Sequence, residues 1–211
     1  MLSERIQAVA KKPLIELCSM VTLLLSYIWV WKGAFHGHSQ VMLTAYFGIG
    51  LAGHRRAGEG LKALGLRLDN GQEAIRLLTR WLAVPLLLVV FATRATWHFP
   101  PIHEWPGDLI WGFVWGSAQQ YGLLCVLYRR LREVFPDGKI ADLIAAGLFS
   151  LFHLPNLFLM VVTLITGYVS CRAYRRVPNL WAVGLFHCIV SFAISHSFPE
   201  SLSLNMKVGP R

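Results

Sequence analysis

The sequence is poor in charged residues and lacks the features that divide a chain into soluble domains. Only 15% of its 211 residues are charged and 55% are hydrophobic, which excludes an ordinary soluble single domain. It has no internal repeat, no low-complexity stretch and no linker rich in proline, glycine or serine. We therefore expect one integral membrane domain that covers residues 1–211.

Cysteine is also scarce, and its spacing argues against several kinds of site. The four cysteines form no C-x-x-C pair, and each falls within or at the end of an apolar run: Cys18, Cys125, Cys171 and Cys188. We expect reduced, packed thiols, with neither disulfides nor a cysteine zinc site.

Long apolar runs are abundant, and they predict an all-α fold, a polytopic membrane helical bundle of about seven transmembrane helices. A spanning helix needs about 20 mainly apolar residues, so the second and fifth runs are short. The first run follows two lysines, as a signal peptide does, but no small-x-small cleavage site follows it, which favours a retained anchor. The runs lie roughly at residues 14–31, 40–53, 77–93, 109–128, 140–153, 157–173 and 180–194.

The net charge of +9 fits membrane topology better than nucleic-acid binding. The basic residues lie between the apolar runs and form no continuous basic and aromatic surface, so we expect a lipid bilayer as partner and no nucleic acid. With seven spans and a cytoplasmic N-terminus, sixteen of the twenty lysines and arginines fall in inside segments. The sequence therefore predicts a multi-pass protein whose C-terminus lies outside.

The longest predicted inside loop carries a helix-start signal. Asn70 and Glu73 have the spacing of a capping box, in which two side chains satisfy the first backbone N–H groups of a helix. The pair predicts a helix that begins there and runs into the third span.

Polar side chains inside the predicted spans are few, and such residues raise a functional-site hypothesis because they are costly in lipid. They lie at similar depths, at about 1.5 Å per residue, so we expect a shared pocket. Interhelical hydrogen bonding without chemistry is the alternative, worth about 0.6–2 kcal/mol. The polar residues are Gln119 and Gln120 in the fourth run, His153 at the end of the fifth, and His187 and Ser191 in the seventh.

Helical spacing relates these residues to their neighbours. Phe149 and His153 are four residues apart and share a face, as do His187 and Ser191. Trp115 is four residues before Gln119 and would line a groove wall on the same stripe.

The stretches "QQYGLL", "FSLFH" and "HCIVS" together resemble the motifs of the CPBP intramembrane proteases, a family that includes CAAX prenyl proteases and bacteriocin-processing proteins. The family pattern is Glu-Glu-x-x-x-Arg, then Phe-x-x-x-His, then His-x-x-x-Asn. The resemblance covers a CPBP-type core at about residues 61–195, which the N-terminal anchor helices at residues 14–53 precede. It implies an intramembrane endopeptidase in a bacterial inner (plasma) membrane that acts on membrane-associated peptides or proteins.

Residue by residue, the resemblance implies a catalytic set and a substrate-contacting set. The catalytic positions are Gln119, Gln120, His153, His187 and Ser191, and the positions expected to contact substrate are Trp115, Phe149 and Asn156. In the family the first glutamate and the histidines activate a water, and the asparagine stabilises the oxyanion.

The chain departs from this pattern at four positions. Glutamines replace both glutamates, Leu124 replaces the arginine and Ser191 replaces the asparagine. An amide cannot accept a proton from water at any working pH, so the glutamate mechanism does not carry over. An arginine without carboxylate partners would be a costly buried cation, so Leu124 is consistent with the two glutamines and indicates natural divergence.

Three functions remain open. The first is an endopeptidase in which His153 or His187 is the base; zinc held by these two histidines is a variant, but two ligands without a carboxylate make a weak site. The second is an inactive relative that binds a membrane peptide or partner as a chaperone, regulator or immunity protein. A small transporter or channel is disfavoured, because the polar residues form one cluster and trace no path across the bilayer.

Overall fold

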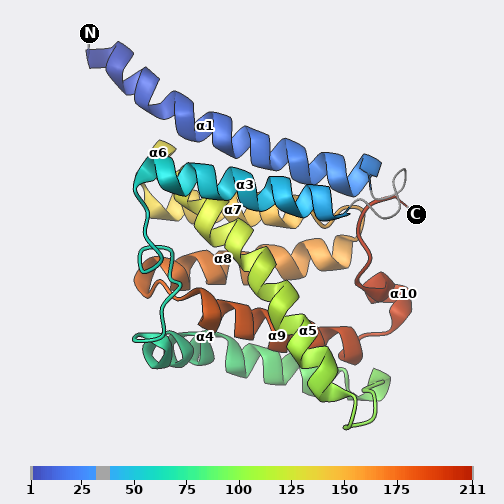
Figure 1. Cartoon of the computed structure of the whole chain (residues 1–211). Coiled ribbons are helices and arrows are strands. Elements are labelled where there is room, and N and C mark those ends of the chain that lie inside the picture. Colours follow the sequence, from blue (N-terminus) through green and yellow to red (C-terminus); the bar gives the residue numbers. More distant parts are fainter. Residues whose placement is uncertain (1, 32–38, 211) are drawn as a thin grey trace. The chain divides into compact units, whose positions relative to one another are not determined.

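A computed structural model describes residues 2–31 and 39–210, with side chains from residue 11 onward. These residues form helices and no strand, which confirms the all-α fold (Figure 1). They fall into two compact units, which we describe separately. Unit 1 comprises Met1–Gly60, Gly122–Cys171 and Val208–Arg211, and unit 2 comprises Leu61–Tyr121 and Arg172–Lys207.

Unit 1 holds the N-terminal helices and the middle of the chain. Helix α1 packs against α3 and α6, and α6 packs against α7 (Figure 1). The elements are α1 (Leu2–Ser26) with the π-helix η1 (Tyr27–Trp31), α3 (Ser39–Ala57), the π-helix η3 (Tyr121–Tyr128), α6 (Arg129–Val134), α7 (Gly138–Leu151) and most of α8 (Leu157–Arg176).

Unit 2 is built around α9 (Leu180–Ser197), which packs against both α4 (Gly71–Ala92) and α5 (Trp105–Gln120). A short helix, η2 (Arg94–Thr96), follows α4. After α9 come α10 (Glu200–Ser203) and the turn η4 (Leu204–Met206), whose three residues have positive φ angles.

Each predicted apolar run lies, to within two residues, on one helix or on an α-helix and the π-helix that follows it. The protein is a membrane protein. Among the described residues, the helices long and apolar enough to cross a bilayer are Lys11–Trp31, Gly71–Ala92, Leu157–Arg176 and Leu180–Ser197. Helix α7 has 14 residues and is about 21 Å long, shorter than a hydrocarbon core of about 30 Å. The count of seven spans stays a prediction, as does the single domain.

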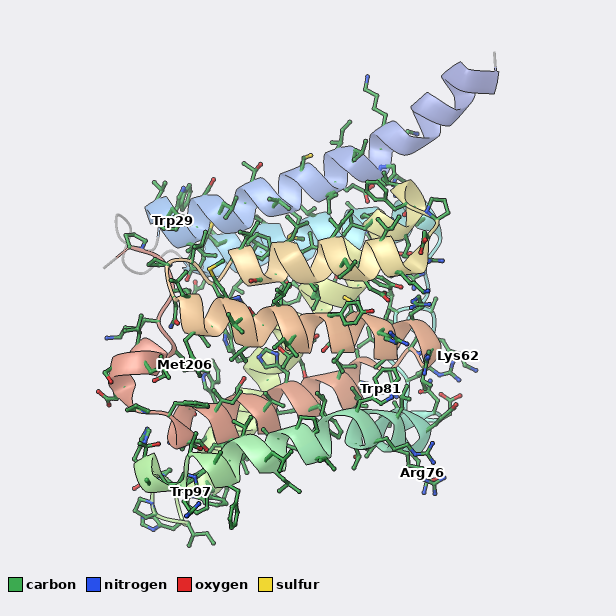
Figure 2. The ribbon with its side chains drawn as sticks, turned by 180° about the vertical axis from the view of Figure 1, so that it is seen from behind. Trp29, Lys62, Arg76, Trp81, Trp97 and Met206 are labelled. Atoms are coloured by element: carbon green, nitrogen blue, oxygen red, sulfur yellow. The ribbon has the colours of Figure 1, made fainter. Side chains whose placement is uncertain are left out.

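Unit 2 has a basic end and an aromatic end. Figure 2 shows Lys62 and Arg76 beside the start of α4, and Trp97 beyond its other end. The guanidinium groups of Arg172 and Arg176 lie over the Trp81 ring, 5.8 Å and 4.9 Å from its centroid. Basic residues at one end and tryptophan at the other are typical of membrane helices, whereas the sidedness of the chain stays a prediction.

Helix α4 begins after Asn70 as predicted, but the capping-box contact is absent because another residue engages the side chain of Asn70. Asn70 occupies the N-cap position without a side-chain cap hydrogen bond. Its Nδ2 donates to the carbonyl of Pro178 (3.0 Å), and its Oδ1 accepts from Nδ2 of Asn179 (2.8 Å). Asn179 itself caps α9 by accepting from the N–H of Ala182 at 2.8 Å. The two asparagines therefore join the start of α4 to the start of α9.

A charged cluster joins three elements of unit 1. The Glu59 carboxylate accepts hydrogen bonds from Arg129 Nε and Arg130 Nη2, each at 2.5 Å, and lies 2.8 Å from His54 Nδ1. Arg130 is 1% exposed and also contacts the carboxylates of Glu133 (2.8 Å) and Glu16 (3.5 Å). The cluster therefore links α1, the end of α3 and α6.

The charges of this cluster hold Glu59 ionised. Burial by itself raises the pKa of Glu59, but the hydrogen bonds from His54 and Arg129 and the charges of Arg129 and Arg130 lower it from 4.5 to about 2.

The cysteines are free, and most are packed as expected. Cys125, Cys171 and Cys188 are buried, whereas Cys18 is exposed on α1, against the expectation of a packed thiol.

Candidate active site

The structure brings together one residue of the first motif and one of the third. Gln120 is the last residue of α5 and is 1% exposed, and His187 lies in the middle of α9. The side-chain Nε2 of Gln120 lies 2.9 Å from Nδ1 of His187. The first and third motifs are therefore in direct contact inside unit 2.

Small residues allow α5 and α9 to approach closely enough for this contact. A Cβ atom at Gly116 would lie 2.8 Å from Cδ2 of His187, and one at Gly112 would lie 3.1 Å from Sγ of Cys188. On the facing helix, a Cβ at Gly184 would overlap Oγ of Ser117. Close helix approach through small residues is typical of membrane bundles.

The contact with Gln120 determines which nitrogen of the neutral His187 ring carries the proton. With the amide in this orientation its N–H can only donate, so Nδ1 accepts and the neutral ring carries its proton on Nε2. The Nε2 atom of the ring is then an N–H donor. The Oε1 atom of Gln120 is buried and has no hydrogen-bond partner among the described residues.

The other predicted residues of unit 2 lie near this pair along the same helices. Gln119 precedes Gln120 and is half-buried, and Ser191 is half-buried one turn after His187. Trp115 lies one turn before Gln119 and is 49% exposed, so its side chain is open to the surroundings.

His153 and Phe149 form the second motif in unit 1 and contact each other as their spacing predicts. Their rings meet edge to face, with centroids 5.0 Å apart. Nδ1 of His153 lies 2.7 Å from the backbone carbonyl of Phe149. Because a carbonyl can only accept, Nδ1 carries the proton, and the neutral ring presents a lone pair on Nε2.

Asn156 has a structural contact that sequence reasoning missed. It is fully buried, and its Oδ1 accepts a hydrogen bond from the N–H of Leu159 at 3.0 Å. This bond caps the start of α8. The spacing of an asparagine just before an apolar helix could have indicated the cap, and a substrate contact for Asn156 stays a prediction.

Leu124, at the family's arginine position, is fully buried in η3. A leucine there needs no polar partner, in agreement with the uncharged glutamines of the first motif. The basic residues that do pair with carboxylates in this region are Arg129 and Arg130.

A metal ion would need side chains grouped so that they could bind it. Among the side chains that the structure describes, no group of three or more His, Cys, Asp or Glu residues is arranged to hold a metal ion.

Residues 121–193 match the family model described as "Type II CAAX prenyl endopeptidase Rce1-like". The match includes His153, His187 and Ser191 and begins one residue after Gln120. It confirms the family resemblance drawn from the motifs. No curated protein and no solved structure matches the chain.

Proposed function

We propose that this chain, a member of the type II CAAX prenyl endopeptidase Rce1-like family over residues 121–193, is an intramembrane endopeptidase with a divergent site. Its substrates are membrane-associated peptides or proteins. The hydrogen bond between Gln120 and His187 carries the proposal, because it orients a histidine of the family motif. Such an orienting contact is typical of catalytic histidines.

The proton positions suit the two histidines to different roles. His153 presents a lone pair on Nε2 and is the general base; it takes a proton from water as the water oxygen attacks the scissile carbonyl. The imidazolium later returns this proton to the leaving amine as the C–N bond breaks. His187 presents an N–H on Nε2 and donates to the oxyanion.

The remaining polar residues act as donors in this proposal. Neither glutamine can serve as the base, because an amide does not take up a proton near neutral pH. Gln120 fixes the ring of His187, Gln119 orients water or substrate, and Ser191 donates to the oxyanion. Trp115, Phe149 and Asn156 remain the proposed substrate contacts.

Co-expression with candidate membrane peptides, including a prenylated peptide with a C-terminal CAAX sequence, tests the proposal. We expect cleavage by the wild type, and a loss of about 100-fold or more in His153→Ala and His187→Ala. The matched control is His103→Ala, which removes a histidine with a 78% exposed side chain and should leave cleavage unchanged. Cleavage by Gln119→Glu together with none by the wild type would reject wild-type peptidase activity.

That last result would leave the second candidate, a catalytically inactive relative that binds a membrane peptide as a chaperone, regulator or immunity protein. The observation that favours it is the fully buried Leu124, where the family's arginine would stand. Crosslinking of a bound peptide that is recovered intact would distinguish this candidate from the peptidase.

A further inference from the structure

A basic pocket of about 570 Å³ lies in unit 2 at the start of α4. It is formed by the loop before α4, the first turns of α4 and the end of α8. Its charged lining residues are Arg67, Asp69, Glu73, Arg76, Arg80 and Arg176.

The acidic residues of the pocket leave several arginines without a carboxylate. Asp69 is ion-paired with Arg67, which uses both Nε and Nη2 in that contact. Arg76, Arg80 and Arg176 take part in no ion pair among the described residues. Glu73 is the remaining acid, so the pocket has an excess of positive charge and favours an anion.

An aromatic ring positions one of these arginines. The guanidinium carbon of Arg176 lies 4.9 Å from the centroid of the Trp81 ring, and Trp81 follows Arg80 directly in the sequence. Figure 2 shows Trp81 on α4. Stacked guanidinium groups keep their N–H donors free at the edge, where they bind phosphate oxygens in a bidentate manner.

The pocket continues into an apolar stripe on the same helix. Arg76, Arg80, Val84 and Leu88 follow one another at intervals of four and share one face of α4. Val84 and Leu88 are 63% and 65% exposed. The distance along the helix from Arg80 to Phe91 is about 16 Å, close to half the thickness of a bilayer's hydrocarbon core. A charged head followed by one leaflet's length of apolar surface matches the shape of a phospholipid.

We propose that this pocket binds the phosphate of an anionic phospholipid headgroup, with Arg76, Arg80 and Arg176 as its ligands and the acyl chains along Val84 and Leu88. Inorganic phosphate offers the same oxygens but would leave the stripe uncovered. A zwitterionic headgroup brings its own cation, which the positive pocket disfavours.

Native mass spectrometry of the detergent-purified full chain tests the proposal, with phosphatidylglycerol, phosphatidylcholine of the same acyl chains and inorganic phosphate as probes. We expect one phosphatidylglycerol per chain, bound at least about 10-fold more tightly than phosphatidylcholine. Equal binding of the two lipids would overturn the proposal. Displacement of phosphatidylglycerol by millimolar inorganic phosphate would identify free phosphate as the ligand and also overturn it.

The double variant Arg76→Gln, Arg80→Gln should weaken phosphatidylglycerol binding by about 25-fold, since each basic residue near an anionic headgroup contributes about a factor of five. The matched control is Arg94→Gln, which removes an exposed arginine at the other end of α4 and should leave binding unchanged. An equal loss in the control would overturn the proposal.

A third variant covers the case in which the double glutamine variant does not fold. Arg76→Lys, Arg80→Lys keeps both charges and should bind phosphatidylglycerol within about 5-fold of the wild type while still preferring it to phosphatidylcholine. Loss of that preference would show that charge at the start of α4 does not select the lipid.

Discussion

The side-chain amide of Gln120 donates to Nδ1 of His187 over 2.9 Å, so the last residue of α5 orients a ring in the middle of α9. This orientation places the proton of the neutral ring on Nε2. A glutamate at position 120, as in the family motif, should move this proton to Nδ1, because a carboxylate can only accept a hydrogen bond from the ring.

We predict that Gln120→Glu moves the proton of neutral His187 from Nε2 to Nδ1. The measurement is the pair of ring ¹⁵N chemical shifts of His187 in the purified protein, wild type against variant. Gln119→Glu is the matched control, since it adds the same charge one residue earlier and should leave the ring tautomer as it is. A wild-type ring that already carries its proton on Nδ1 would contradict the geometry.

The close approach of α5 and α9 should depend on Gly116. Gly116→Ala places a Cβ atom 2.8 Å from Cδ2 of His187, and we expect a loss of about 1–3 kcal/mol in the free energy of unfolding. Thermal unfolding of the wild type and the variant in detergent measures this loss of stability. Gly107→Ala, on the same helix with open space around it, should not destabilise the protein. Equal melting temperatures for the two variants would show that the helices are not held at this distance.

Removing Glu59 should expose the cost of a buried guanidinium. We expect Glu59→Gln to lower the free energy of unfolding by about 3 kcal/mol, the lower end of the range for broken buried pairs, because Arg130 keeps contacts with Glu16 and Glu133. The control is Asp69→Asn, which breaks the exposed ion pair with Arg67 and should change the melting temperature little. Similar losses of unfolding free energy in Glu59→Gln and Asp69→Asn would mean that burial does not strengthen the ion pairs of Glu59.

The same carboxylate predicts the direction of acid destabilisation. The pKa of Glu59 is lowered from 4.5 to about 2, so its ionised form is favoured by folding. The stabilisation of the folded protein by ionised Glu59 is complete above pH 4.5 and is lost as the pH falls toward 2. Between pH 6 and pH 3, the melting temperature of the wild type should therefore fall more steeply than that of Glu59→Gln. Parallel curves would indicate that Glu59 is not stabilised by its partners.

Helical spacing was enough to predict the local part of the candidate site. Phe149 and His153 are four residues apart, and their rings are in contact although His153 lies in the turn just after α7 ends at Leu151. The similar depth of the polar residues led us to expect a shared pocket; within unit 2 Gln120 and His187 are in contact, and a pocket that also includes His153 stays a prediction. These expectations rest on the regular spacing and rise of helices, which an apolar pattern specifies well.

Contacts between segments far apart in the chain could not be predicted in this way. Glu59 and Arg130 are 71 residues apart, and no local pattern indicates that they meet. The capping box failed for a related reason, since Asn179, 109 residues away, engages the side chain of Asn70. The change from α-helix to π-helix directly after Gln120 likewise has no signal in the apolar pattern.

The cluster around Arg130 bears on how this protein can be shortened. The motifs and the family match lie after residue 60, so the first two helices look like a dispensable extension. Yet Glu16 and Glu59 both precede that point, and their carboxylates contact the Arg130 guanidinium, which is 1% exposed. A truncated protein that starts after residue 60 would strand this cation without most of its counter-charges. The N-terminal helices are therefore part of the minimal stable unit, and a search for the smallest stable fragment should begin upstream of Glu16.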